Sequence, residues 1–151
     1  MIITPQKNGT YKVEITDWQS RMFRDLVKEL KSFIANENNP LVNRLYPVAY
    51  QNDEIANSEY TSLTYEDLYQ SHLAALGILE EISEIAEVSE DTLLRIMQAV
   101  NILRLVLGTR LGICDEEDFS EITEDHPDHN LWLIYHLLGE ILSIIVDSVG
   151  N

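Results

Sequence analysis

Residues 89–113 constrain the fold of this chain more than any other segment. Ser89 is a typical helix N-cap residue, and the acidic pair after it favours the positive end of a helix. Beyond this start, apolar side chains occupy almost every helical position: Leu93, Leu94, Ile96, Met97, Val100, Ile102, Leu103, Leu105, Val106 and Leu107. A helix that is apolar on all sides is stable only where other elements cover it. We therefore expect this helix in the middle of a bundle, with Gly108 and Gly112 suited to a close crossing or a C-terminal stop.

Three more helices are predicted before the central one. The apolar residues between 18 and 34 recur at three- and four-residue steps, the period of a helix with one buried face, and Asp17 is its predicted N-cap. A similar stripe predicts a long helix over residues 64–86, headed by Thr64. A short helix is expected over residues 53–62. We expect the two long helices to turn their apolar stripes toward the central helix.

A last helix is predicted from residue 127 or 128 to residue 149. It has a wide apolar surface and a narrow polar stripe, which consists of His136, Glu140, Ser143 and Asp147. The stripe interrupts the apolar run before it reaches the roughly 20 residues of a membrane span, so we expect no membrane insertion. Large apolar surfaces that stay exposed mark interfaces. This helix is therefore the predicted contact for a homodimer or for another protein partner.

The first residues predict a β-hairpin. An Asn-Gly pair at residues 8–9 is a strong signal for a tight hairpin turn, and Tyr11, Val13 and Ile15 alternate with polar residues behind it. The start lacks the basic leader and the apolar run of a signal peptide. We therefore expect a short two-stranded sheet that lies against the helices.

Together these segments predict a mostly α fold in a single domain, residues 1–151. The β-hairpin takes residues 1–16, and a bundle of about five helices takes residues 17–151. A chain of this length buries about two-thirds of the surface of its unfolded state, so it needs no disulfide or metal ion to fold.

The charges are distributed unevenly along the chain. It carries 26 acidic and 10 basic residues, for a formal net charge of −16. Residues 1–50 hold seven basic and five acidic residues, whereas residues 51–151 hold three basic and 21 acidic ones. Binding to nucleic acid phosphates or to anionic lipid requires Lys and Arg, so we expect neither nucleic acid nor a membrane as a partner. The acidic part of the chain favours a basic protein partner.

No catalytic motif can be identified in the sequence. Cys114, the only cysteine, is followed by four carboxylates that disfavour its thiolate, and a lone cysteine is typical of a cytoplasmic protein. There is no nucleophile elbow, phosphate-binding Gly loop or dinucleotide fingerprint, so we expect no cofactor. His72, on an apolar stripe, is interpreted as a hydrogen-bonded core histidine.

Residues 125–129, Asp-His-Pro-Asp-His, are the strongest candidate for a metal site. His126 and His129, with the carboxylates beside them, are ligand types that Zn²⁺ and other transition metals accept. The alternative is an ordinary helix start, with an Asp as the cap, Pro127 in the first turn and both imidazoles exposed. Residues 115–126 do not fit an EF-hand loop, which requires Gly at position six and Glu at position twelve.

Several short motifs occur in a specific order along the chain. They are residues 44–50 (RLYPVAY), Asp53-Glu54, Glu59-Tyr60, Ser62-Leu63-Thr64, Asn101 and residues 104–113 (RLVLGTRLGI). This set resembles an uncharacterised bacterial family with a domain of unknown function, whose members are short, acidic, helical proteins. They are chiefly actinobacterial and often encoded beside the Clp protease adaptor ClpS. The resemblance covers nearly the whole chain and implies a helical fold and a cytoplasmic setting, with no established activity. The chain departs from the family pattern at Asn43 and His136.

Arg104 and Arg110 lie on or just after the apolar central helix. A guanidinium in such a place needs a partner because it keeps its charge. We expect these two residues and Arg44 to clamp residues 36–62 onto the bundle. The carboxylates that the resemblance implies for this clamp are Asp53, Glu54 and Glu59. Alternatively, Arg44, Tyr50, Arg104 and Arg110 line a pocket for a small anion or for the carboxylate of a partner.

Two function classes remain. The first is a protein-interaction or regulatory module that docks a partner, or another copy, through its acidic surface or its last helix. The second is a small-molecule or metal-dependent enzyme that uses the Arg44, Arg104 and Arg110 cluster or the His126 and His129 loop. Because the sequence offers no identifiable nucleophile–base pair for an enzyme, the first class is favoured.

Overall fold

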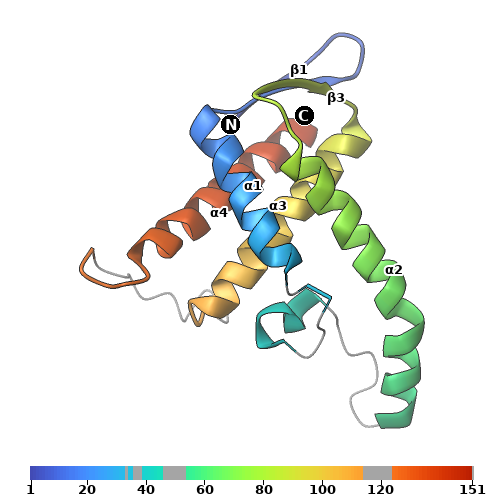
Figure 1. Cartoon of the computed structure of the whole chain (residues 1–151). Helices are drawn as coiled ribbons and strands as arrows, with labels where there is room; N and C mark the ends of the chain where they lie inside the picture. The colour runs from blue at the N-terminus through green and yellow to red at the C-terminus, as the bar shows by residue number, and fades with distance from the viewer. Residues whose placement is uncertain (33, 36–38, 46–53, 114–123, 151) are drawn as a thin grey trace.

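The helices lie below a small β-sheet (Figure 1). The computed structural model describes residues 1–32, 34–35, 39–45, 54–113 and 124–150. These ranges contain four α-helices, one 3-10 helix and three strands. In chain order the elements are β1 (Ile2–Pro5), β2 (Tyr11–Glu14), α1 (Asp17–Lys31), the 3-10 helix η1 (Pro40–Leu45), α2 (Glu54–Glu80), β3 (Ile85–Val88), α3 (Glu90–Arg110) and α4 (His129–Val149).

The sheet is antiparallel, with the strand order β1-β2-β3. β1 and β2 form the predicted hairpin, and Gly9 in its turn has a φ of +86°. β3 pairs with β2, with Ala86 opposite Val13, and lies where the sequence predicted the end of a helix. The four residues of β3 fit a helical period and a strand period equally well. A two-stranded hairpin is marginally stable by itself, so a third strand stabilises it. The predicted helix over residues 64–86 was therefore wrong in its last turns, because these residues complete the sheet.

α2 joins two helices that the sequence predicted separately. It runs without interruption from Glu54 to Glu80, so Thr64 lies inside it and not at its start. Residues 54–76 contain neither Gly nor Pro, and Ser or Thr alone does not end a helix. In the described ranges the bundle therefore has four α-helices and not five.

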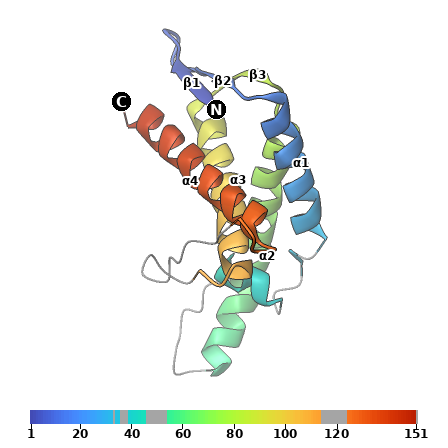
Figure 2. The same cartoon turned by 90° about the vertical axis from the view of Figure 1, so that its left-hand side faces the viewer.

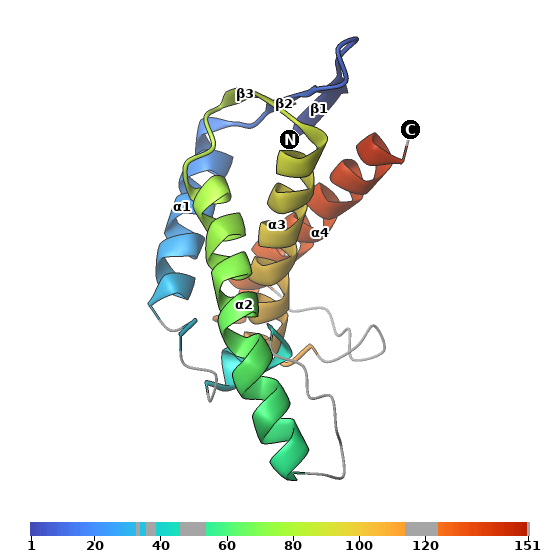
Figure 3. The same ribbon diagram turned by 90° about the vertical axis from the view of Figure 1, so that its right-hand side faces the viewer.

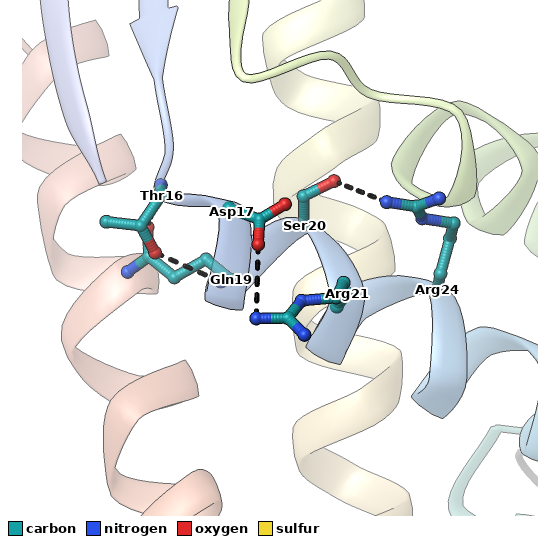
Figure 4. Close-up of polar contacts among 6 residues, drawn as sticks. All are labelled: Thr16, Asp17, Gln19, Ser20, Arg21 and Arg24. Carbon is teal, nitrogen blue, oxygen red and sulfur yellow. Dashed lines mark hydrogen bonds and ion pairs between the residues drawn. The ribbon is translucent and has the colours of Figure 1, made fainter.

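α1 begins one residue earlier than predicted. The N-cap is Thr16, whose Oγ1 accepts a hydrogen bond from the Gln19 backbone N–H at 3.0 Å, while Gln19 Oε1 accepts from the Thr16 N–H at 3.1 Å (Figure 4). This reciprocal pair is a capping box. Asp17 lies in the first turn, where it forms an ion pair with Arg21 at 3.1 Å (Figure 4).

α3 occupies the centre of the bundle, as the sequence predicted. It lies between α2 and α4 (Figure 2) and also contacts η1 and α1. Ser89 caps its start by accepting from the Thr92 backbone N–H at 3.1 Å, and Gly112, at a φ of +77°, follows its last residue. Its buried side chains share one core with the inner face of the sheet and with the other helices. The largest fully buried side chains of this core are Phe23, Leu30, Ile34, Leu76, Leu79, Leu93, Ile96, Leu138, Ile141 and Ile145.

Candidate functional site

α4 is covered on one side only. It packs on α3 and on β1, and it diverges from α1 and α2 at the edge of the bundle (Figures 2 and 3). Tyr135, Leu138, Ile141 and Ile145 are its buried residues. By length and composition α3 and α4 are both long and apolar enough to cross a membrane, but 50% of the most apolar window of α3 is buried, against 22% for α4. α4 therefore leaves more of its apolar residues half-buried or exposed than α3 does.

The exposed and half-buried side of α4 is called the α4 outer face here. It consists of Leu133, His136, Glu140, Ser143, Ile144, Val146 and Asp147. Leu133 and Val146 are 47% and 55% exposed. The helix contains no Lys or Arg, and its only two carboxylates lie on this face. The face therefore combines three apolar side chains with a polar stripe that carries two negative charges and no Lys or Arg.

Arg104 lies where α3 crosses α4. Its guanidinium carbon is 4.6 Å from the centroid of the Tyr135 ring, which is the geometry of a cation–π contact. A Cβ added at Gly139 would lie 3.3 Å from Arg104 Nε, so the glycine lets the side chain lie against α4. Nε is buried and has no hydrogen-bond acceptor among the described residues. Arg104 is therefore a half-buried cation that an aromatic ring stabilises only in part.

Arg110 contacts a different helix. Its Nη1 donates to Glu29 Oε1 of α1 at 3.2 Å, and both side chains are exposed. Residues six apart in a helix point about 120° away from one another, which explains why Arg104 reaches α4 while Arg110 reaches α1. Arg110 thus joins α3 to α1, and no described ion pair links either guanidinium to residues 36–62.

The side chains of the other predicted members of the arginine cluster are not among those that the structure describes. The backbone of Arg44 belongs to η1, which packs against α3, but its side chain is not described. Tyr50 and Asp53 lie outside the described ranges, as do the side chains of Glu54 and Glu59. The arginine clamp and the four-residue pocket therefore stay predictions.

His72 is the core histidine that the sequence predicted. It is buried in α2, and its Nε2 donates to the Leu45 carbonyl oxygen of η1 at 3.3 Å. Burial lowers the pKa of His72 from its ordinary value, and the hydrogen bond to Leu45 opposes this effect. The imidazole therefore favours its neutral form, and it ties η1 to α2.

The two predicted metal-binding histidines have separate neighbours. His126 Nδ1 accepts a hydrogen bond from the Asp128 backbone N–H at 3.0 Å, which occupies one of its two ring nitrogens. His129 stacks on Trp132, with 5.9 Å between ring centroids. Within the described ranges no three His, Cys, Asp or Glu side chains gather as a metal site would require, and most of the acidic segment before His126 lies outside those ranges.

A groove between α1 and α4 escaped the sequence-based prediction. It has a volume of about 310 Å³ and is lined by Trp18, Arg21, Met22, Asp25, Leu26 and Ile134. Trp18 belongs to the apolar stripe of α1 but is 53% exposed, because it lies in the first turn, where α4 has diverged. A large aromatic residue in the first turn of an amphipathic helix was the signal in the sequence.

A family model described as a domain of unknown function, DUF2017, matches residues 2–149. No curated protein and no solved structure matches the chain. The family match spans the hairpin, the central helix and α4, and so includes every element described above. The chain therefore belongs to the DUF2017 family.

Proposed function

We propose that this protein is a cytoplasmic interaction or regulatory module that docks another protein on the α4 outer face. The observation that carries the proposal is the incomplete cover of α4, an apolar helix of which 22% of the most apolar window is buried. Exposed apolar surface of this extent costs free energy in water and is removed when a partner covers it.

The charges of α4 favour a protein over a lipid surface as the occupant. Helices that lie on membranes carry Lys or Arg on their polar face and bind anionic lipid through them. α4 has no basic residue, and Glu140 and Asp147 project from its outer face. A protein surface with apolar side chains and one or two cations complements this face better than lipid does.

The proposal also includes the kind of partner that we expect. The net charge of −16 supports a partner with basic groups and disfavours nucleic acid. The resemblance of the motifs adds a bacterial origin and a gene neighbourhood that includes the ClpS adaptor, which makes protein-degradation machinery a good place to look for the partner. No cofactor is part of the proposal.

An enzyme is the alternative, acting through the arginine cluster or through His126 and His129. It requires convergent polar groups around a cavity. Arg104 and Arg110 instead contact α4 and α1 separately. The pocket beside Arg110 has a volume of about 40 Å³, and six of its eight lining residues are apolar. These observations favour the interaction module.

A photo-crosslinking residue at position 133 tests the proposal in living cells. Leu133 is on the α4 outer face, and Leu94, on α3, is a matched control with 37% exposure. We expect illumination to attach a discrete protein at position 133 and none at position 94. Crosslinking only to lipid, or no crosslinked product at position 133, would contradict the proposal.

A further inference from the structure

We propose that β3 binds an extended basic segment of another protein, which joins the sheet as a further antiparallel strand along the β3 free edge. This edge is the side of Ile85–Val88 that faces away from β2. The bound segment carries an apolar side chain opposite Ile85 and Lys or Arg opposite Glu87. Figure 3 shows β3 at the side of the sheet that lies away from α4, so this site is separate from the α4 outer face.

The register of the sheet defines the β3 free edge. The Ile15 N–H donates to the Glu84 carbonyl oxygen at 2.9 Å, and every second residue of a strand bonds to the same neighbour in an antiparallel ladder. The backbone N–H and carbonyl groups of Ile85 and Glu87 therefore point away from β2. In the part of the chain that the structure describes, no strand pairs with them. Such a row of backbone groups is a template for another strand.

The opposite edge of the sheet is protected. The Gln6 N–H donates to the Thr10 carbonyl oxygen at 2.8 Å, so by the same rule the backbone groups of Ile3 and Pro5 point away from β2. Pro5 has no N–H to offer there, and α4 packs against β1 (Figure 2). β3 contains no Pro and, among the described elements, packs chiefly on β2. The β3 free edge is therefore the more accessible of the two.

Ile85 explains why the bound segment should carry an apolar residue. Its side chain is 66% exposed, the highest value among the large apolar side chains that the structure describes. It lies opposite Glu14 on the outer face of the sheet, whereas Val13, the next residue of β2, points into the core. A strand at the β3 free edge would place one side chain about 5 Å from that of Ile85. An apolar residue there would remove apolar surface of both from water.

The charges around β3 explain why the segment should be basic. Residues 80–91 contain six carboxylates and no Lys or Arg. Glu80 pairs with Lys31, and Lys12, opposite Glu87 on β2, pairs with Glu14 instead. The other five carboxylates form no ion pair with the described residues; they are Glu81, Glu84, Glu87, Glu90 and Asp91. Cations of an added strand would complement them.

Glu87 is the carboxylate closest to the added strand. Its side chain is on the outer face with that of Ile85, two residues before it. Hydrogen bonds from Thr10 and Asn8 lower the pKa of Glu87, so it keeps its negative charge. A second copy of β3 would bring the same carboxylates to this edge, which is unfavourable. The charge therefore selects a basic segment over another copy of this chain.

A designed peptide tests the geometry. The probe is Arg-Lys-Thr-Ile-Lys-Arg with both ends blocked, which in an antiparallel strand sets its first Lys opposite Glu87 and its Ile opposite Ile85. The N–H groups of these two peptide residues face β3. Methylation of both nitrogens should raise the dissociation constant at least about fivefold, since two hydrogen bonds are lost. Methylation of the Thr nitrogen, which faces away from β3, is the matched control and should leave binding intact.

Amide hydrogen exchange followed by NMR locates the bound peptide. The N–H groups of Ile85 and Glu87 should exchange at least about fivefold more slowly at saturating peptide than in the free chain. Those of Ala86 and Val88, which bond to β2, should be protected in both states. This alternation is the signature of an added strand, because binding through charge alone does not select every second residue.

A pair of charge-neutralising variants tests the electrostatic part. Glu87→Gln should raise the dissociation constant of the peptide about threefold. Glu140→Gln, at an exposed position on the α4 outer face, removes the same charge and should leave it unchanged. Circular dichroism verifies that both variants are folded.

The opposite results overturn the proposal. Equal binding of all the methylated peptides, or binding that leaves Ile85 and Glu87 unprotected, would show attraction by charge without an added strand. Equal effects of the two variants would place the peptide elsewhere. Protection of Ile85 and Glu87 that grows with chain concentration in the absence of peptide would identify a second copy as the occupant. A peptide that does not bind at all also overturns the proposal, and none of these results affects the role proposed for α4.

Discussion

α3 and α4 are both 21 residues long and similarly apolar, yet the fold treats them differently. α3 has neighbours on several sides and buries nine residues, whereas α4 buries four. The difference teaches that apolar composition does not by itself decide burial, because burial also depends on how many elements reach a helix. In α3 the apolar surface forms the core, and in α4 part of it remains available to another molecule.

Truncation of one side chain in each helix should produce the largest contrast. Ile96 of α3 is fully buried, and Ile96→Ala should lower the free energy of unfolding by about 2–5 kcal/mol, since it leaves a cavity. Leu133→Ala on α4 should change it by less than about 0.5 kcal/mol when the chain is dilute. Urea unfolding measures both. Equal losses would show that the α4 outer face is part of the fold and not a free surface.

The two glycines at the α3–α4 crossing should differ next. A Cβ at Gly108 would lie 3.2 Å from the Tyr135 ring, so Gly108→Val should destabilise the fold by about 1–3 kcal/mol through overpacking. At Gly139 the neighbour is the flexible Arg104 side chain, and Gly139→Ala should be neutral or gain up to about 1 kcal/mol from helix propensity. Thermal melts compare the two, and a larger loss for Gly139→Ala would contradict this order.

The residues that precede α3 and α4 should differ in their contribution to stability, by a smaller amount. Ser89 caps α3 through a side-chain hydrogen bond, so Ser89→Ala should cost about 1 kcal/mol. Asp128 precedes α4 but makes no such bond, and Asp128→Ala should cost less than about 0.5 kcal/mol. Chemical denaturation of the two variants under one set of conditions checks the difference, which disappears if Asp128 caps α4 in solution.

The thermal stability of the fold should depend on pH through His72, which is buried in α2. The pKa of His72 is lowered in the folded state, so the unfolded chain binds its proton first as the pH falls below about 6.5. The contribution of this group is complete above that pH and is lost as the pH falls through the lowered folded-state pKa. The melting temperature should therefore fall by a few degrees between pH 7.5 and 5.5, and by less in His72→Gln. Identical pH profiles for the two proteins would contradict the assignment.

Part of the fold could be predicted because its signals are local. The hairpin turn requires a positive φ, which Gly9 supplies, and the start of α3 requires a capping hydroxyl, which Ser89 supplies. β3 could not be predicted in the same way, because four residues with two apolar positions fit a helix or a strand until β2 is placed beside them. The continuity of α2 was missed for a related reason, since cap residues within a helix look the same as caps at its start.

The candidate site was predictable in its residue types but not in its geometry. An arginine at position 104, within an apolar helix, is visible in the sequence as a group that needs a partner. The ring of Tyr135 and the space at Gly139, which define its surroundings, come from a helix about 30 residues later. Arg104 and Arg110 were predicted as members of one cluster, and the structure shows Arg104 against Tyr135 and Arg110 paired with Glu29.

The sequence by itself determined that residues 90–110 must be covered, because no helix with that many apolar positions is stable in water alone. It also determined that the positive charges would be few and therefore individually important. Only the tertiary structure decided that α4, which is at least as apolar, would be covered on one side. The reason is that periodicity is a property of one segment, whereas cover is a property of the space around it, set by the directions in which the other helices pack.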